Sequence, residues 1–389
     1  MRDSTANGKL PKPAKPYPDF PLFPHASGRW AKKVRGRLHY FGRWDRGEDP
    51  MVALQRWKDQ EEDLRAGRVP RVKQNGLTLE DLSDRFLTWK KRLCDAGELS
   101  HRTFLDYFGT CRRLVQFFGK SRLVSDLAAD DFEALRAHLA SSRGPEALAV
   151  AIKKTRGVLK YAYDQGLIQS PVRYGQAFNR PAKRVLIKAR QERGPKMFSP
   201  EEIRKMLDAA DPAMRAMILL GVNCGFGPSD LAKLPIKAID LKGGWIDFPR
   251  PKTGVHRRCP LWPETVEAIK SYLRKRPEPR NETAVGLLFV TRVGGPYVHA
   301  DGLANGIGPH FARLAKRLGI YRRGFGLYTF RHVFETVGGD SRDQVAVDHI
   351  MGHSRGDMAS IYREGISDER LRAVAEHVRR WLFNLPEPR

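Results

Sequence analysis

A strongly cationic stretch near the middle of the chain, residues 176–197, most constrains how this sequence can fold. It includes the run NRPAKRVLIKARQERGPK and shows little apolar periodicity, so it predicts a linker rather than part of a core. Ser199, Pro200 and Glu202 follow directly, and they combine a capping box with proline at the first helical position, which marks the start of a helix. The 389-residue chain is therefore expected to divide into domains that each bury their own core.

The rest of the chain divides in the same way. Residues 1–27 carry six prolines and predict a flexible tail. Residues 28–69 alternate basic and aromatic residues between glycines and then become helical, which predicts a small basic β-sheet with one helix. Residues 77–175 predict an all-helical domain, in which Thr78 and Asp81 cap the first helix, and residues 198–389 predict a mixed α/β domain with a C-terminal helix. The expected fold class is mainly α with a small antiparallel β component.

The charge balance points to the partner. Lys and Arg number 70 against 44 acidic residues, which gives a net charge of +26 and a pI near 10.2. Such an excess favours binding to double-stranded DNA, and a basic surface that serves only solubility is the alternative. The basic module could also serve only to pack or dimerise, and basic helix faces could simply be solvated. The residues expected to contact DNA are Lys32, Lys33, Arg35, Arg37, Arg43, Arg102, Lys153, Lys154, Arg257 and Arg258.

Cysteine usage and hydropathy indicate the cellular compartment in which the protein is expected. The four cysteines, Cys94, Cys111, Cys224 and Cys259, lie far apart and form neither a zinc-binding spacing nor a disulfide framework. No apolar run approaches the roughly 18 residues that a membrane span needs. We therefore expect a cytoplasmic protein associated with the nucleoid, without a membrane contact, a metal or a cofactor.

Candidate chemistry gathers in the segment from Gly326 to Tyr362. Arg331 offers a guanidinium that can neutralise two phosphate oxygens, His353 can donate to a third, and the phenol of Tyr362 can attack phosphorus. Fixed cations of this kind would make a metal unnecessary. The alternative from the residues alone is that these side chains cap helices and line a core.

The order Y-T-F-R-H, then M-G-H-S, then a tyrosine nine positions after that histidine, resembles the C-terminal signature of the tyrosine recombinases, the phage integrase family. The resemblance implies that Arg331 is the second catalytic arginine, His353 the later histidine and Tyr362 the nucleophile. Tyr328 departs from the family, because it stands where the first histidine of H-x-x-R usually stands. A phenol there can still donate a hydrogen bond to phosphate, although it carries protons poorly near neutral pH.

A second departure lies in the run CGFGPSDLAKL. The family usually reads here T-G-x-R-x-S/G-E-L, and Gly225, Ser229, Asp230 and Leu231 match. Gly227 occupies the place of the first catalytic arginine, and a glycine cannot hold a phosphate. If the protein is active, another cation is expected to stand in for that side chain, and the candidates are Arg257, Arg258, Arg322, Arg323 and Arg215.

The run Lys252-Thr253-Gly254 lies between alternating apolar residues and predicts a β-hairpin. It is similar to the family hairpin that carries a catalytic lysine, which would let Lys252 protonate the leaving oxygen. A surface lysine in a turn is the alternative. Residues 287–291 predict a short strand. Beyond Tyr362, an apolar helix face is expected to dock on a neighbouring protomer or, alternatively, on its own domain; its residues are Leu371, Val374, Val378 and Leu382.

The resemblance implies a site-specific DNA recombinase or integrase that cleaves and rejoins strands through a 3′-phosphotyrosine, with no cofactor. It further implies a homo-oligomer on DNA, an arm-type DNA-binding module in residues 28–69, a core-binding domain in residues 77–175 and an accessory DNA-bending protein. A recombinase relative that binds DNA without cutting it is the alternative that Gly227 and Tyr328 motivate. A type IB topoisomerase is a weaker one.

Overall fold

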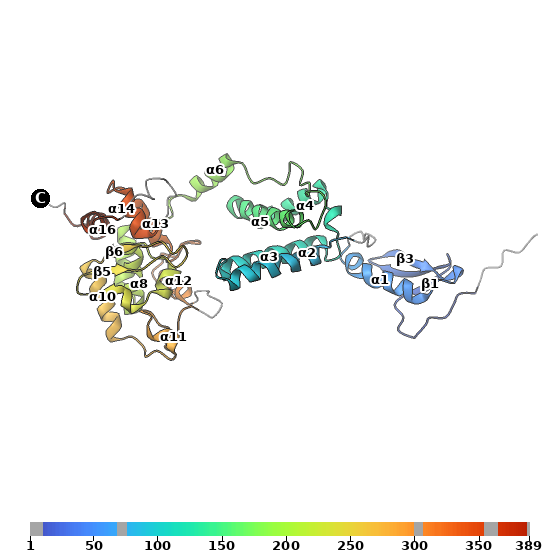
Figure 1. The fold of residues 1–389 in the computed structure, drawn as a ribbon, viewed down its shortest axis with the longest axis horizontal. Helices are drawn as coiled ribbons and strands as arrows, with labels where there is room; N and C mark the ends of the chain where they lie inside the picture. The colour runs from blue at the N-terminus through green and yellow to red at the C-terminus, as the bar shows by residue number, and fades with distance from the viewer. Residues whose placement is uncertain (1–10, 68–75, 299–305, 354–364, 387–389) are drawn as a thin grey trace, which may run out of the picture. The chain divides into compact units, whose positions relative to one another are not determined.

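The computed structural model describes residues 11–67, 76–298, 306–353 and 365–386 (Figure 1). Contacts divide the chain into two units, residues 1–188 and 189–389. The division falls inside the predicted linker, but the linker is partly helical, because α6 spans Lys183–Arg193 and buries none of its side chains. No helix in the described part of the chain is long and apolar enough to cross a membrane.

The first module is an antiparallel sheet with one helix. Its strands are β1 (Phe23–His25), β2 (Arg29–Val34) and β3 (Arg37–Arg43), in the order β1-β2-β3, and α1 spans Pro50–Arg65. Arg35 and Gly36 both adopt positive φ between β2 and β3, the conformation of a two-residue hairpin turn. The predicted sheet and helix are present.

The core of this module lies between the sheet and α1. Trp30 and Phe41 from the sheet pack with Trp57 from the helix. Phe20 and Leu22 are also buried in this core, so the module begins before Gly28 and includes the end of the stretch predicted as a flexible tail. The reason is that burying the two apolar side chains stabilises this stretch against the core, and the neighbouring prolines do not prevent that contact.

The second core of the first unit is all-helical, as predicted. Its helices are α2 (Leu79–Asp95), α3 (His101–Phe118), α4 (Ala129–Ala140) and α5 (Pro145–Asp164). The predicted cap of α2 is present, since Thr78 Oγ1 accepts from the backbone N–H of Asp81 at 3.1 Å and the Asp81 carboxylate accepts in return. Cys111 and Leu114 of α3 are buried between the helices.

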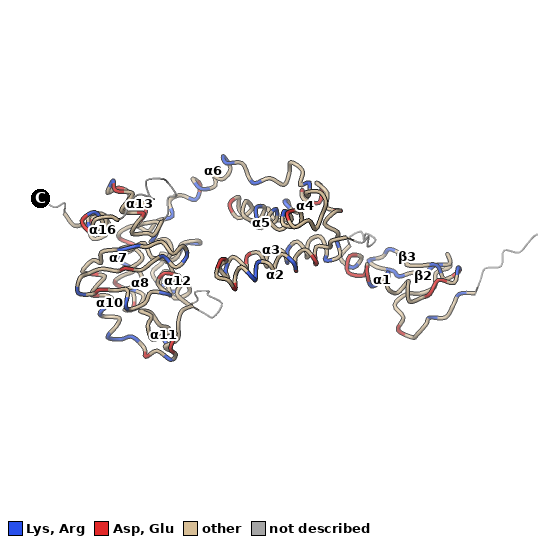
Figure 2. The backbone as a smooth tube through the Cα atoms, viewed as in Figure 1, with Lys and Arg blue, Asp and Glu red and all other residues tan. Residues whose placement is uncertain are grey.

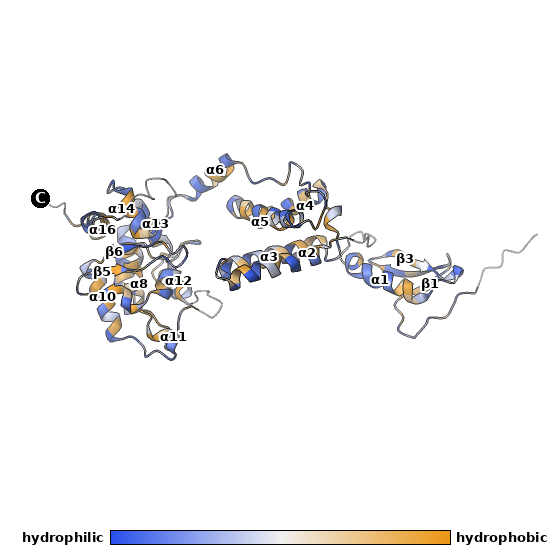
Figure 3. Cartoon of the chain, in the orientation of Figure 1, coloured by the Kyte–Doolittle hydropathy of each residue, from blue (hydrophilic) through white to orange (hydrophobic). Residues whose placement is uncertain are grey.

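The second unit is built around α8 (Pro212–Cys224), where every residue from Ala216 to Cys224 is buried. Figure 3 shows the hydropathy of the residues along each element. The helices α10 (Pro263–Arg274), α13 (Thr329–Gly339) and α16 (Asp368–Phe383) pack against it. The remaining helices are α7 (Pro200–Ala209), α9 (Pro228–Lys233), α11 (Glu282–Val285), α12 (Ile307–Arg317) and α14 (Gln344–Met351). The predicted capping box opens α7, where Ser199 and Glu202 bond reciprocally.

A small antiparallel sheet completes this unit. It consists of β4 (Ile239–Asp240), β5 (Trp245–Asp247) and β6 (Arg258–Pro260) in that order. The predicted hairpin around Lys252 joins β5 to β6, and its turn is closed by the N–H of Gly254, which donates to the Arg250 carbonyl at 2.8 Å. Residues 287–291 form isolated bridges rather than the predicted strand.

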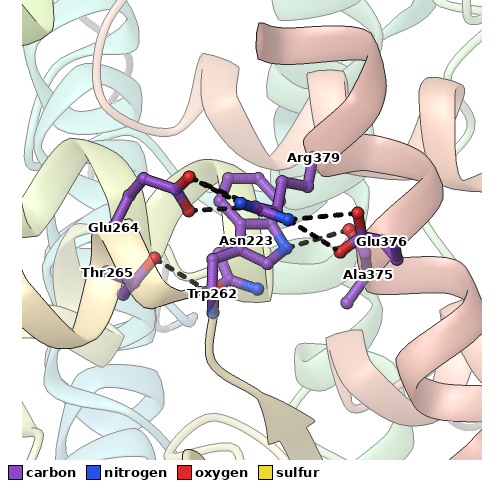
Figure 4. A network of polar contacts seen from close by, with 7 residues as sticks. All are labelled: Asn223, Trp262, Glu264, Thr265, Ala375, Glu376 and Arg379. Atoms are coloured by element: carbon purple, nitrogen blue, oxygen red, sulfur yellow. Dashed lines mark hydrogen bonds and ion pairs between the residues drawn. The ribbon is translucent and has the colours of Figure 1, made fainter. Parts of the chain in front are cut away.

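The apolar face of α16 packs on its own domain. Leu371, Val374, Val378 and Leu382 are all fully buried there. The Trp262 indole N–H donates to the Ala375 carbonyl at 2.9 Å, and Arg379 forms an ion pair with Glu264 at 2.9 Å (Figure 4). The own-domain alternative therefore describes the single chain, because the core of the unit offers the face a partner, and docking on a neighbouring protomer when DNA is bound stays a prediction.

Asn223 holds the end of α8 to the start of α10 (Figure 4). Its amide donates to the Pro260 carbonyl at 2.9 Å, and its oxygen accepts from the backbone N–H of Trp262 and from the Thr265 hydroxyl, both at 2.9 Å. Asn223 and Thr265 are fully buried. An amide in such a place stabilises the fold because all of its partners would otherwise be unpaired away from water.

We expect Asn223→Ala to lower the free energy of unfolding by about 2 to 4 kcal/mol, because it leaves several buried polar groups without partners. Thr265→Val removes one donor at nearly constant volume and should cost about 1 kcal/mol. Thermal unfolding of the full chain checks both variants by the shift of the transition that belongs to the second unit. Equal shifts for the two variants would contradict the assigned network.

Candidate active site

Arg331 lies in the first turn of α13 with its side chain turned into the domain. The residue is 3% exposed. Its Nη1 donates to the Gly225 carbonyl at 2.8 Å, just after α8, and its Nη2 donates to the Met351 carbonyl at 2.8 Å, at the end of α14. These bonds account for part of the five N–H groups of the guanidinium. The pKa of Arg331 is lowered by burial and then by the neighbouring charge of Arg250, yet a guanidinium stays protonated.

The structure brings His353 to Arg331, as predicted. His353 Nε2 lies 2.7 Å from Arg331 Nη2 and must accept from it, because the guanidinium has no lone pair to offer. Gly352, in the left-handed conformation at the end of α14, turns the chain so that the imidazole faces α13. The bonds of Arg331 to Gly225, Met351 and His353 leave one N–H on Nη1 and the Nε N–H, and each of these can donate to a phosphate oxygen.

The other imidazole nitrogen faces two carboxylates. His353 Nδ1 lies 3.5 Å from a Glu335 oxygen and 3.6 Å from an Asp348 oxygen. The three groups have the spacing of metal ligands. However, Nδ1 carries the proton when Nε2 accepts from Arg331, and a protonated nitrogen cannot bind a metal. The carboxylates therefore orient a neutral imidazole, the role that a carboxylate commonly has beside histidine.

Tyr328 covers Gly227. A side-chain carbon added to Gly227 would lie 3.0 Å from Cδ2 of the Tyr328 ring and 3.3 Å from Cε2. Tyr328 is 47% exposed, so the other side of its ring is open. The two residues at which the sequence departs from the family pattern are thus in contact, and the phenol ring fills space beside the missing side chain.

Arg257, which we expected among the DNA contacts, is 1% exposed and lies inside the domain. Its Nη2 forms an ion pair with Asp230 at 3.0 Å, its Nε donates to the Phe248 carbonyl, and its guanidinium stacks 4.1 Å from the Phe226 ring centre. The other Asp230 oxygen accepts from the Gly227 N–H at 2.7 Å. Arg257 is therefore not an open surface contact, because its guanidinium is buried between Asp230, the Phe248 carbonyl and the Phe226 ring.

Arg250 was not singled out from the sequence. It lies on the hairpin two positions before Lys252 and is half-buried. Its Nη1 donates to the Gly352 carbonyl at 3.4 Å, a long bond, and a side-chain carbon added to Gly352 would meet the stems of Arg250 and Arg257, each at 3.3 Å from its Cδ. The signal that could have found Arg250 is its place beside the lysine in the run Arg250-Pro251-Lys252.

Two predicted catalytic residues are not brought to Arg331 by the described structure. Lys252 is exposed in the hairpin turn, and no hydrogen bond or ion pair joins it to Arg331 or His353. Tyr362 lies outside the described residues. The roles of Lys252, Tyr328 and Tyr362 stay predictions.

The remaining predicted DNA contacts differ in availability (Figure 2). Lys154 pairs with Asp106 at 2.7 Å, Arg43 pairs with Asp45 at 2.7 Å, and Arg258 is held between Asp247 and Asp368. Lys32 lies 5.7 Å from the Trp57 ring centre. The exposed members of the set are Lys33, Arg35, Arg37, Arg102 and Lys153, of which Arg102 lies 3.6 Å from the Asp106 carboxylate.

The histidines near Arg331 should make stability depend on pH. The pKa values of His332, His349 and His353 are all lowered from 6.5, in each case first by burial and then by neighbouring basic groups. Below pH 6.5 the unfolded chain therefore binds more protons than the folded chain. Stability from these groups is present above that pH and is lost as the pH falls through the lowered folded values.

We expect the thermal midpoint of the second unit to fall between pH 7 and pH 5, measured by calorimetry on the full chain. His349→Gln should remove part of this dependence, because its ring is half-buried beside His256. The exposed Arg274→Gln serves as a control that leaves the pH dependence unchanged. A midpoint that is constant over this range would contradict the neutral state assigned to His353.

Solved structures of DNA-bound integrases are similar to this chain. The Tn1549 transposon integrase, solved with circular intermediate DNA, is 17% identical, with a TM-score of 0.54 over 77% of this chain and 99% of its own. The lambda integrase dimer bound to a COC' core site is 16% identical, with a TM-score of 0.53 over 90% of this chain and 96% of its own. The lambda integrase tetramer on a Holliday junction is also 16% identical, with a TM-score of 0.55 over 90% and 98%. These likenesses show the fold.

Sequence comparison supplies the family. No curated protein matches the chain. The model of the phage integrase family matches residues 196–367, a range that contains α7 to α14 and the paired Arg331 and His353. The predicted resemblance to this family is confirmed. Residues 196–367 of the chain are therefore a domain of the phage integrase family, the family of the tyrosine recombinases.

Proposed function

We propose that this protein cleaves and rejoins DNA strands at specific sites through a 3′-phosphotyrosine formed on Tyr362. The observation that carries the proposal is the buried Arg331 guanidinium, oriented by two carbonyls and the neutral His353, with two N–H groups left for a phosphate. This pair lies inside a phage integrase family domain. Preorganised donors of this kind act at the charge that develops on a reacting phosphate.

The reaction exchanges one phosphoester for another. The Tyr362 oxygen forms a bond to phosphorus, and the bond from phosphorus to the 5′-oxygen breaks. The phenol releases its proton to solvent, and Lys252 donates one to the departing 5′-oxygen, so the step balances without a nucleotide or a redox cofactor. In the second step a 5′-hydroxyl from the partner strand attacks the phosphotyrosine and releases Tyr362.

Assembly on DNA is part of the proposal. The net charge of +26 and the structural likeness to integrases solved on DNA as a dimer and a tetramer support a homo-oligomer on double-stranded DNA. The exposed cations of β2 and β3 support a separate arm-type contact by the first module. If the first module contacts a distal site, the DNA between the two sites must bend, and we include an accessory DNA-bending protein in the proposal for this reason. A location on the nucleoid is a further part of the proposal.

The test is a nicked suicide duplex built from the DNA that flanks the gene. The protein should form a covalent adduct that survives denaturing electrophoresis and maps by mass spectrometry to Tyr362. Tyr362→Phe should form none, and Arg331→Ala should cleave about 10³-fold more slowly, because an arginine on a transferring phosphoryl group contributes about that much. Arg274→Ala, on an exposed face of α10, is the matched control. A full-length protein that binds the duplex without forming an adduct would identify a binding protein that does not cut.

Affinity for duplex DNA should fall steeply with salt. Each phosphate that a cation neutralises contributes about 0.9 to the slope of log K against log salt, so several contacts should weaken binding by about 10³-fold or more between 50 and 200 mM. Lys33→Ala and Arg37→Ala, both exposed on the sheet of the first module, should each reduce the slope by about one, whereas the paired Lys154→Ala should change it less. Fluorescence anisotropy on labelled duplex measures the slope. Affinity that is independent of salt would contradict the charge argument.

A further inference from the structure

The site has one anion-binding guanidinium where the family pattern provides two. Arg331 is present, but Gly227 stands at the place of the other arginine and offers no side chain. A phosphate in transfer carries charge on its non-bridging oxygens throughout the reaction, and a single guanidinium leaves part of that charge uncompensated. A cation from elsewhere in the domain must therefore reach the same phosphate if the protein cleaves DNA.

Two further arginines meet Arg331 at the turn from residue 351 to 353. Arg331 bonds the Met351 carbonyl and the His353 ring, and Arg250 bonds the carbonyl of Gly352 between them. The stem of Arg257 also lies against Gly352. Three guanidinium-bearing side chains from α13 and from the hairpin therefore surround three consecutive residues. Their mutual repulsion is consistent with the lowered pKa of Arg331, for which Arg250 is the largest charged cause.

We propose that Arg250 is a catalytic residue that supplies the second guanidinium, in place of the side chain missing at Gly227. The inference rests on the proposed strand-transfer function and names the group that completes its site. Arg250 is half-buried and is held by one long hydrogen bond of 3.4 Å, so its donors can turn to a phosphate oxygen at little cost. It makes no covalent bond in the reaction and acts on a non-bridging oxygen.

Three of the other candidates, Arg215, Arg258 and Arg322, are held by partners elsewhere, whereas the buried Arg257 keeps its Nη1 without a hydrogen-bond partner and Arg323 is exposed. Arg257 is bound to Asp230 and to the Phe248 carbonyl inside the domain. Arg258 is held by Asp247 and Asp368, and Arg322 is paired with Glu202 at 2.7 Å. Arg215 donates to the Leu207 carbonyl at 2.8 Å.

Arg257 has the role of a positioning residue in this arrangement. Its ion pair with Asp230 fixes the hairpin to the start of α9, while the same carboxylate holds the Gly227 N–H. Its stem then supports Gly352 from the side that faces Arg250. Loss of Arg257 should therefore misplace Arg250 and also leave Asp230 buried without its charge partner, which destabilises the fold.

The contact between Gly227 and Tyr328 limits how the family arginine can be restored. The first carbon of a side chain at position 227 would lie 3.0 Å from the Tyr328 ring, so the ring would have to shift by a few tenths of an ångström. Gly227→Arg alone should therefore misplace Tyr328 or itself. Gly227→Arg combined with Tyr328→His gives the arginine room and restores the family pattern at both positions.

The experiment measures single-turnover cleavage of the suicide duplex by the full chain. Arg250→Ala should cleave about 10²- to 10³-fold more slowly than the parent, and Arg250→Lys should recover part of the loss, because loss of one preorganised charge donor costs about this much. Affinity for the duplex should stay within about threefold, since Arg250 is one of many cations on the protein. Arg274→Ala is the matched surface control.

A second substrate separates a catalytic role from a structural one. A methylphosphonate at the scissile position replaces one charged oxygen by a methyl group, so it removes the charge that Arg250 is proposed to neutralise. Arg250→Ala should cleave this duplex at a rate within about tenfold of the parent protein. Adding Gly227→Arg and Tyr328→His to Arg250→Ala should likewise raise cleavage of the ordinary phosphate duplex at least tenfold.

The outcomes are distinguishable. If Arg250→Ala cleaves the phosphate duplex like the parent, the assignment of Arg250 is overturned while the proposed function stands. If cleavage is lost and the methylphosphonate does not restore it, or if the thermal midpoint falls by more than about 5 °C, Arg250 is structural and the assignment is again overturned. If the parent protein itself forms no adduct, the proposed function fails and the role of Arg250 fails with it.

Discussion

The buried guanidinium of Arg331 is the contact on which the geometry of the site depends. A charge inside a protein is tolerated only when hydrogen bonds replace its lost water, and here carbonyls from the ends of α8 and α14 and the His353 ring supply them. Because these partners come from three segments, Arg331 fixes α13, α8 and α14 relative to one another. Removing it would leave two carbonyls and an imidazole without a donor, so its role in binding phosphate and its role in the fold cannot be fully separated.

Elements set by local chemistry could be predicted from the sequence. The capping residues Thr78 and Ser199 mark helix starts that are observed at those positions, because a cap depends on residues within one turn. The hairpin around Lys252 is likewise local. Features that depend on packing between distant residues could not be predicted. Phe20 lies in a proline-rich stretch, yet it is part of the core of the first module. The linker contains the helix α6, although none of the residues of α6 is buried. The burial of the α16 face on its own domain depends on Trp262, Glu264 and other residues far away in the sequence.

The site was predictable to a similar extent. Arg331 and His353 were identified through their resemblance to a family signature, and the structure joins them. The contact of Tyr328 with Gly227 could not be foreseen, because nothing in either local sequence says that α13 begins against the start of α9. The burial of Arg257 was missed for a related reason. Two consecutive arginines at the start of β6 are typical of a surface, and only the position of Asp230 and Phe226 shows that one of the two turns inward.

The start of α9 shows why the fold tolerates a glycine at position 227. Asp230 accepts from the backbone N–H of Gly227, which any residue except proline would offer, so the helix start does not depend on the side chain at that position. The same carboxylate forms an ion pair with Arg257, and this ion pair holds the hairpin beside the site. A chain that lacks the arginine on α9 therefore still holds the hairpin beside His353, and the hairpin carries both Arg250 and Lys252. If Arg250 has the proposed role, the hairpin turn positions both the guanidinium that neutralises the phosphate and the lysine that protonates the leaving oxygen. A change in that turn would therefore affect charge neutralisation and proton transfer together.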